Sequence, residues 1–167
     1  MAERKTIVVP IGTATVQMRP VGFALYAEEF FIAGCSIPEH SRARGNTTFT
    51  PVPYYLMCRA LELIFKSYLL TKNWTEDQLS KRKYGHNLES LWNVAKNSGL
   101  PTLLGEIPSD FESDLVAANA YYNSKNFEYF NFSRWAHGYK DLPPLSRFIG
   151  AVRAIVEKTK EHVLDVS

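Results

Sequence analysis

Apolar residues recur every three to four positions over most of this chain, which is the spacing of amphipathic α-helices. The pattern is broadest from about Pro53 to Lys72, where the predicted helix has an apolar face wide enough to be mostly buried. That face is made by Leu56, Met57, Ala60, Leu61, Leu63, Ile64, Phe65, Tyr68 and Leu70. The remaining stripe carries Arg59, Glu62 and Lys66. Glu62 precedes Lys66 by four residues, an order that favours a helix-stabilising ion pair.

Other segments repeat this helical spacing between polar or proline-containing breaks. They run over about Val21–Gly34, Asn87–Ser98, Ser109–Lys125 and Pro144–Leu164, with a shorter helix from Thr75 to Lys83. Residues 101–108 are predicted as a linker, and residues 126–143 as an aromatic loop. About five helices with short links and one apolar face each predict an all-α fold, an antiparallel up-and-down helical bundle.

The first 20 residues follow a different pattern. Val, Ile and Thr dominate residues 5–18, with Pro10 and Gly12 between them, so we predict a short extended or β-hairpin N-terminal arm. Two strands alone are marginal in water, so the arm is expected to pack on the body of the protein or on a partner. Residues 1–20 thus form the arm, and residues 21–167 one helical domain, long enough to bury a core without metals or disulfides.

Composition narrows the function only slightly. The net charge of +2 is too small to indicate polyanion binding by itself, although a local basic patch would still allow it. The aromatic content of 13% fits a thick core together with a self-association surface, so we expect a homodimer formed through the long helices. Cys35 and Cys58 form no CxxC pair, so the sequence predicts no metal site, no redox site and no cofactor.

Neither a secretion signal nor a membrane span is predicted. The apolar stretch Ile7–Ile11 is too short for the core of a signal peptide. No apolar run approaches the roughly 18 residues that a membrane-spanning helix needs. We therefore expect no membrane partner and a cytoplasmic location.

One spaced motif is divided between two stretches of the chain. The helix within residues 52–74 contains A-x-E-L-x-x-K-x-x-L, and after a variable link the chain continues with G-H-N-L-x-x-L at residues 85–91. The motif positions are Ala60, Glu62, Leu63, Lys66, Leu69, Gly85, His86, Asn87, Leu88 and Leu91. In this order and spacing the chain resembles the HEPN superfamily, over roughly residues 22–164.

The resemblance implies an up-and-down helical bundle that often dimerises. Many HEPN proteins are ribonucleases of defence or toxin–antitoxin systems, and others are non-catalytic partners that bind RNA or nucleotides. The ribonucleases carry an arginine followed four to six residues later by a histidine, at the start of the last long helix. Here only two residues separate Arg134 from His137. Arg82 precedes His86 with three residues between them, but this pair lies before an earlier helix and not at the start of the last long one. The chain therefore departs from the ribonuclease motif.

Four residues form a candidate site for an anionic ligand. Lys81, Arg82 and Lys83 can contact RNA phosphates without reading sequence, or they can simply be a solvated helix end. His86 stands at the predicted start of a helix, where it can contact a phosphate or act as a general base. Alternatively, it closes the turn by bonding to neighbouring backbone, as short polar residues do at helix starts.

A second candidate site would be catalytic. His137 would activate a ribose 2′-hydroxyl, and Arg134 would stabilise the charge that develops on the phosphorus. Pro143 and Pro144 follow closely, which places both residues on a loop rather than on a rigid helix. The aromatic residues around them either stack bases or pack in the core or a dimer interface: Tyr121, Tyr122, Phe127, Tyr129, Phe130, Phe132 and Trp135.

Taken together, these patterns favour a non-catalytic module that binds RNA or nucleotide phosphates, in a defence or toxin–antitoxin context. A metal-independent endoribonuclease that uses Arg134 and His137 is one alternative. The other alternative is a protein-interaction or structural module whose partner is encoded in the same operon.

Overall fold

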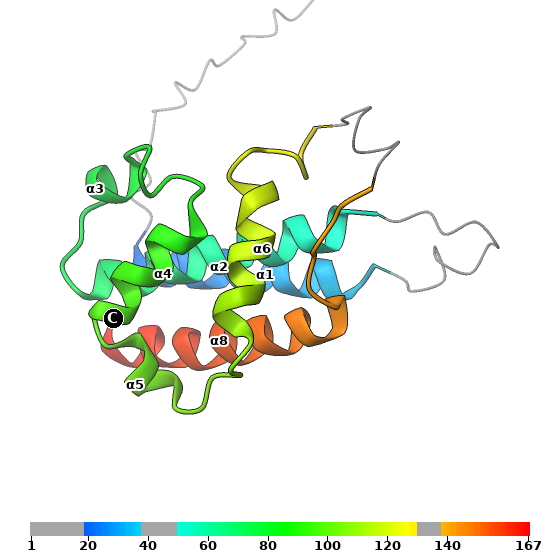
Figure 1. Cartoon of the computed structure of the whole chain (residues 1–167). Helices are drawn as coiled ribbons and strands as arrows, with labels where there is room; N and C mark the ends of the chain where they lie inside the picture. The colour runs from blue at the N-terminus through cyan, green and yellow to red at the C-terminus, as the bar shows by residue number, and fades with distance from the viewer. Residues whose placement is uncertain (1–18, 38–49, 130–137) are drawn as a thin grey trace, which may run out of the picture.

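A computed structural model describes residues 19–37, 50–129 and 138–167. These residues form seven helices and no strand, so the predicted all-α class is confirmed for the described part of the chain. The helices are α1 (Pro20–Cys35), α2 (Val52–Thr71), α3 (Glu76–Ser80), α4 (Leu88–Asn97), α5 (Leu100–Leu104), α6 (Phe111–Tyr122) and α8 (Leu145–Val166) (Figure 1). The predicted extended or β-hairpin arm falls almost wholly outside the described residues.

The first two helices form an antiparallel pair. At one end of the pair, the Ser67 hydroxyl donates a 2.7 Å hydrogen bond to the backbone carbonyl of Pro20. At the other end, Gly34 of α1 lies so close to α2 that a Cβ atom there would stand 2.4 Å from the terminal methyl of Met57. Glycine at position 34 therefore allows the two helices to approach closely.

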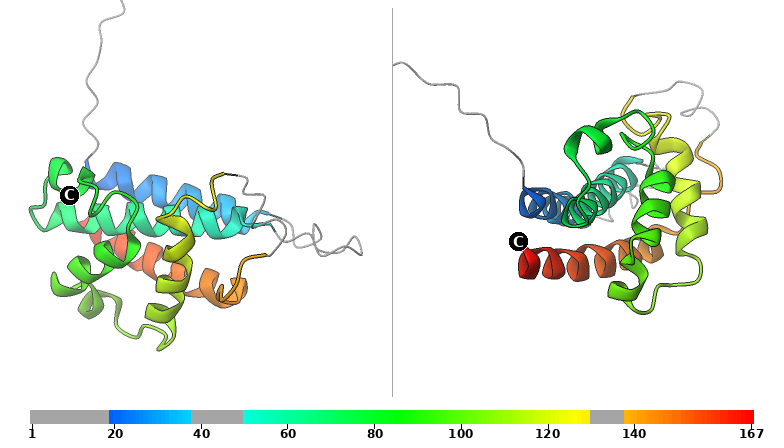
Figure 2. Two further views of the ribbon diagram at one scale, coloured as in Figure 1. Left: turned by 45° about the horizontal axis from the view of Figure 1, so that its top comes forward. Right: turned by 90° about the vertical axis from the view of Figure 1, so that its left-hand side faces the viewer.

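The C-terminal helix α8 runs parallel to α2. Tyr54 near the start of α2 stacks on Phe148 near the start of α8, with ring centroids 6.2 Å apart. Tyr68 and His162 meet near the other end, at 6.0 Å. The three long helices α1, α2 and α8 thus lie side by side, and α1 runs opposite to the other two (Figures 1 and 2).

Two of the shorter helices, α4 and α6, pack on α2, and a third, α5, packs on α8 and α4. Helix α4 packs on α2 and α6, and α6 crosses the direction of α8 steeply in both Figure 1 and the right-hand view of Figure 2. Helix α5 occupies part of residues 101–108, so the prediction of a plain linker there is wrong. Pro101 lies in the first turn of α5, where a proline is tolerated because that turn needs no backbone donor.

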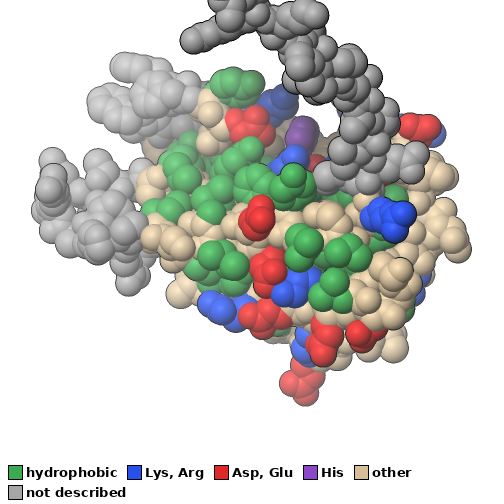
Figure 3. Space-filling view, turned by 180° about the vertical axis from the view of Figure 1, so that it is seen from behind, with side chains coloured by type: hydrophobic (Ala, Val, Ile, Leu, Met, Phe, Trp, Pro, Cys, Tyr) green, Lys and Arg blue, Asp and Glu red, His purple; other side chains and the backbone are tan. Residues whose placement is uncertain are grey.

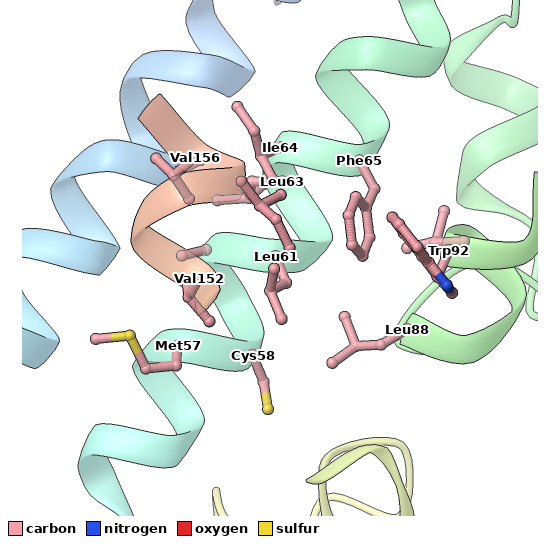
Figure 4. Packing of buried hydrophobic residues seen from close by; sticks show 14 of the residues in the cluster. Met57, Cys58, Leu61, Leu63, Ile64, Phe65, Leu88, Trp92, Val152 and Val156 are labelled. Atoms are coloured by element: carbon pink, nitrogen blue, oxygen red, sulfur yellow. The ribbon is translucent and has the colours of Figure 1, made fainter. Parts of the chain in front are cut away.

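The core is centred on α2, as its wide apolar face predicts. Leu63 is 5% exposed and Ile64 fully buried. Phe65 meets Trp92 of α4 at a centroid distance of 5.6 Å, next to the buried Leu88 (Figure 4). Since α4 begins at Leu88, this packing fixes the position of the chain just before α4 relative to α2.

Helix α1 is apolar on its outer face as well as its inner face. Leu25, Tyr26 and Ile32 are 46%, 48% and 54% exposed. The helical spacing of the sequence predicts Tyr26 and Ala27 on one buried face. Ala27 is buried together with Ala24 and Phe31, whereas Tyr26 is exposed, so the prediction is wrong for Tyr26. Seen from behind, the molecule shows hydrophobic side chains gathered across this face (Figure 3).

Candidate anion-binding site at the start of α4

A buried carboxylate on α2 organises the polar side of the molecule. Glu62 is 1% exposed. Its Oε1 accepts hydrogen bonds from Arg59 at 3.0 Å and from Lys66 at 2.6 Å. Its Oε2 accepts one from the Tyr122 hydroxyl at 2.5 Å and lies 3.1 Å from Nδ1 of His86. The sequence prediction of a simple ion pair on the exposed stripe of α2 is therefore incomplete, because Glu62 joins three segments of the chain inside the protein.

The charge states within this cluster follow from its surroundings. Burial alone would raise the pKa of Glu62, but the neighbouring Lys66 and Arg59 outweigh burial and hold that pKa below its ordinary value. Burial and the Glu62 charge together raise the pKa of the Tyr122 hydroxyl. At neutral pH, Glu62 is thus a carboxylate that accepts hydrogen bonds, and Tyr122 is a neutral donor.

The chain before α4 is tied to this cluster and to α6. The Lys66 ammonium donates to the Gly85 carbonyl at 3.0 Å in addition to Glu62. Asn87 caps α4, since its side-chain oxygen accepts from the Ser90 backbone N–H at 3.0 Å. Asn119 of α6 in turn accepts from the Leu88 backbone N–H at 2.9 Å. These bonds hold the Gly-His-Asn turn in one position between α2 and α6.

An open pocket of about 830 Å³ lies outside this turn. It is lined by Ser80, Arg82, Lys83, Gly85, His86, Asn87, Asn123, Ser124 and Lys125. The lining contains three permanently cationic side chains, one histidine and several hydroxyl and amide groups, with no Asp or Glu among the described residues. Such a set of donors suits an anion, and the first turn of α4 adds the positive end of its helix dipole.

The structure brings together part of the predicted ligand site. Arg82, Lys83 and His86 line the pocket, whereas Lys81 caps the end of α3, is exposed and does not line it. Sequence reasoning missed Lys125, which reaches the pocket from the turn after α6. Its signal was weak, because only the fold brings the end of α6 next to the start of α4.

The predicted catalytic pair cannot be placed, because Arg134 and His137 lie outside the described residues. Catalysis by these two residues stays a prediction. Of the aromatic residues around them, Tyr121, Tyr122 and Phe127 are buried, which agrees with a packing role, and Tyr129 is 65% exposed.

The described residues contain no group of His, Cys, Asp and Glu side chains arranged to hold a metal ion. Within the same part of the chain, no helix combines the length and the apolar character needed to cross a membrane. No protein-family model, curated protein or solved structure matches the chain.

Proposed function

We propose that this protein binds the phosphate groups of RNA or of a nucleotide in the pocket at the start of α4, without catalysing a reaction there. The observation that supports the proposal most directly is the lining itself. Arg82, Lys83 and Lys125 surround His86 with no carboxylate among the described lining residues. Cationic side chains placed in this way attract phosphate without reading sequence.

The way the pocket is anchored also supports the proposal. The Lys66 bond to Gly85 and the Asn87 cap hold the turn rigidly against α2 and α6. A rigid turn loses little conformational freedom when a ligand binds, so more of the electrostatic attraction appears as affinity. Arg82 and Lys83 are exposed to solvent beside this turn, and the Lys83 ammonium lies over the ring of Tyr84, 5.3 Å from its centroid.

The experiment is a titration of the protein into a fluorescent single-stranded RNA, and separately into a labelled nucleotide, at several salt concentrations. Binding should weaken steeply with salt, because each phosphate contact releases counterions. Arg82→Gln and Lys125→Gln should each weaken RNA binding and reduce the slope of log affinity against log salt by about 0.7.

Arg153→Gln is the matched control, because it removes one positive charge from α8 without touching the pocket. It should leave the salt slope unchanged. Absence of affinity for both RNA and nucleotide at low salt would overturn the proposal. Equal losses from the pocket variants and from Arg153→Gln would show that net charge, rather than this pocket, attracts the ligand.

Kinship with the HEPN superfamily, and the complete up-and-down bundle that it implies, are part of the same proposal. The support is that the spaced motif residues Glu62, Lys66 and His86 meet in one cluster. Contact between the separated members of the motif is what one shared structural unit would give.

A second function is favoured by the outer face of α1. We propose that this face mediates self-association into a homodimer. Leu25, Tyr26 and Ile32 are about half exposed. The only charged residues of α1 are Glu28, which is paired with Lys160, and the exposed Glu29. A helix that is apolar all round is normally buried, so a second copy of α1 packed against the first would account for its composition.

Light scattering coupled to size-exclusion chromatography tests this proposal. The wild type should elute as a dimer, and Leu25→Glu or Ile32→Glu should elute as a folded monomer, because each variant places a charge in the contact. Val116→Glu, a change at a similarly exposed apolar residue of α6, is the control and should remain dimeric. A wild-type protein that is monomeric at high concentration would refute self-association.

A further inference from the structure

The imidazole of His86 lies between the protein interior and the pocket. Its Nδ1 is 3.1 Å from Glu62 Oε2, while its side chain is 41% exposed and lines the pocket. The ring of Tyr122 packs edge-on against it, with centroids 5.9 Å apart and planes at 86°. One ring nitrogen is thus held by the cluster, and no described residue bonds to the other nitrogen, Nε2.

The position of the ring hydrogen follows from this geometry. Glu62 is a carboxylate, and a carboxylate only accepts hydrogen bonds. Nδ1 of His86 therefore carries the hydrogen that it donates to Glu62. In the neutral ring, Nε2 must then present a lone pair, which repels an anion. Protonation at Nε2 replaces that lone pair with a charged N–H donor.

We propose that the pocket takes up a proton together with its anionic ligand, at Nε2 of His86, and that Glu62 is the residue that positions His86 for this exchange. The inference rests on the proposed function, since it requires a phosphate group in the pocket. Histidine is the side chain that ordinarily changes charge between about pH 5 and 8. Ligand affinity should therefore rise as the pH falls through that range.

Several other ionisable groups lie near His86. They are Arg59, Glu62 and Lys66 on α2, Tyr122 on α6, Arg82 and Lys83 before α4, Glu89 in the first turn of α4, and Lys125 after α6. The ordinary pKa values of lysine and arginine lie well above this range, and those of aspartate and glutamate lie below it. The pKa of Glu62 is lowered and that of Tyr122 is raised, so neither group titrates near neutrality. A change of affinity between about pH 5.5 and 8 thus reports on His86.

The probes must also keep a constant charge. A phosphomonoester is unsuitable because its second ionisation occurs at about pH 6. We would use a short single-stranded RNA with a 5′-hydroxyl end, and sulfate as a competing small anion, both at constant ionic strength. RNA should bind about tenfold more weakly at about pH 8 than at about pH 5.5, the effect of losing one charge-assisted hydrogen bond. Calorimetry in two buffers of different ionisation enthalpy should show proton uptake on binding.

Three variants at the pocket separate charge from structure. His86→Gln cannot gain a charge, so at both pH values it should bind RNA as weakly as the wild type does at about pH 8. His86→Arg is always charged and should bind independently of pH. Arg82→Gln should bind more weakly than the wild type at both pH values while keeping the tenfold ratio. Thermal unfolding of each variant shows whether its fold is intact.

The role of Glu62 is tested on the wild-type protein, because Glu62→Gln is expected to be destabilised. Nitrogen NMR of the histidine rings at alkaline pH should show the His86 hydrogen on Nδ1, and a hydrogen on Nε2 would overturn the positioning role. RNA binding that is equal at both pH values would overturn proton uptake and leave the proposed function intact. Absence of binding at every pH would instead overturn the proposed function itself.

Discussion

Removing the charge of Glu62 should destabilise the protein far more than removing a charge from an exposed ion pair. Glu62→Gln keeps the side-chain shape, so the cost arises from lost charge rather than from a cavity. Lys66 and Arg59, whose side chains are 12% and 29% exposed, then lose their counter-charge. Breaking a buried pair on one side costs about 3–5 kcal/mol. Both cations can still reach water, so we expect the lower end, about 3 kcal/mol in the free energy of unfolding.

Urea unfolding measures this loss directly. With a denaturant dependence of about 2 kcal/mol per molar urea, the midpoint should fall by about 1.5 M and the slope should stay unchanged. The pH dependence gives a second signature. Because the pKa of Glu62 is lowered in the folded state, its stabilisation is complete above the unfolded value of about 4.3 and is lost as the pH falls through the folded value. The difference between wild type and variant should therefore shrink in acid.

The control is an ion pair of the same type on the surface. Arg153 and Glu157 are 3.7 Å apart with side chains 53% and 59% exposed. Glu157→Gln should change the free energy of unfolding by less than about 0.5 kcal/mol. If Glu62→Gln cost no more than this control, or cost the same at acidic and neutral pH, the cluster around Glu62 would not be the source of stability that we describe.

The remaining predictions concern stability, and urea unfolding measures each of them. Tyr122→Phe removes the hydroxyl that donates a 2.5 Å hydrogen bond to Glu62, and the free energy of unfolding should fall by about 2 kcal/mol. A much smaller loss would show that the acceptor is not a charged carboxylate. Gly34→Ala should destabilise by about 1 kcal/mol, because its new methyl group would stand 2.4 Å from Met57 and this overpacking exceeds the gain in helix propensity. Gly150→Ala has open space around it, so it should stabilise by up to about 0.8 kcal/mol.

The pattern of apolar residues predicts the buried face of α2 well and that of α1 poorly. In α2 the apolar face and the charged stripe are distinct, so the helix and the burial of Leu63 and Ile64 could be predicted. In α1 apolar residues surround the helix, and periodicity places Tyr26 and Ala27 on the same inner face although only Ala27 is buried. The inner face is chosen by the close approach to α2 at Gly34, which is a contact between distant residues.

The candidate site likewise has residues that could be predicted from the sequence and residues that could not. Local chemistry was sufficient to place a helix start close to Asn87 and basic residues before it, because a turn and a helix start depend on neighbouring residues. The cap itself is made by Asn87, and not by His86, for which the sequence allowed a turn-closing role. Lys125 and Tyr122 could not be assigned to the site, since α6 must first cross beside α4 and α2 to bring them there.

Sequence alone was enough for the helical class of the described residues and for most helix boundaries, because backbone hydrogen bonds within a helix join residues four positions apart. Packing decided that Glu62 is buried, that it holds His86 by one ring nitrogen and that His86 lines a basic pocket. The reason is physical: burial and charge compensation depend on which surfaces meet in space, and residues 24 and 60 positions from Glu62 in the chain supply two of its partners.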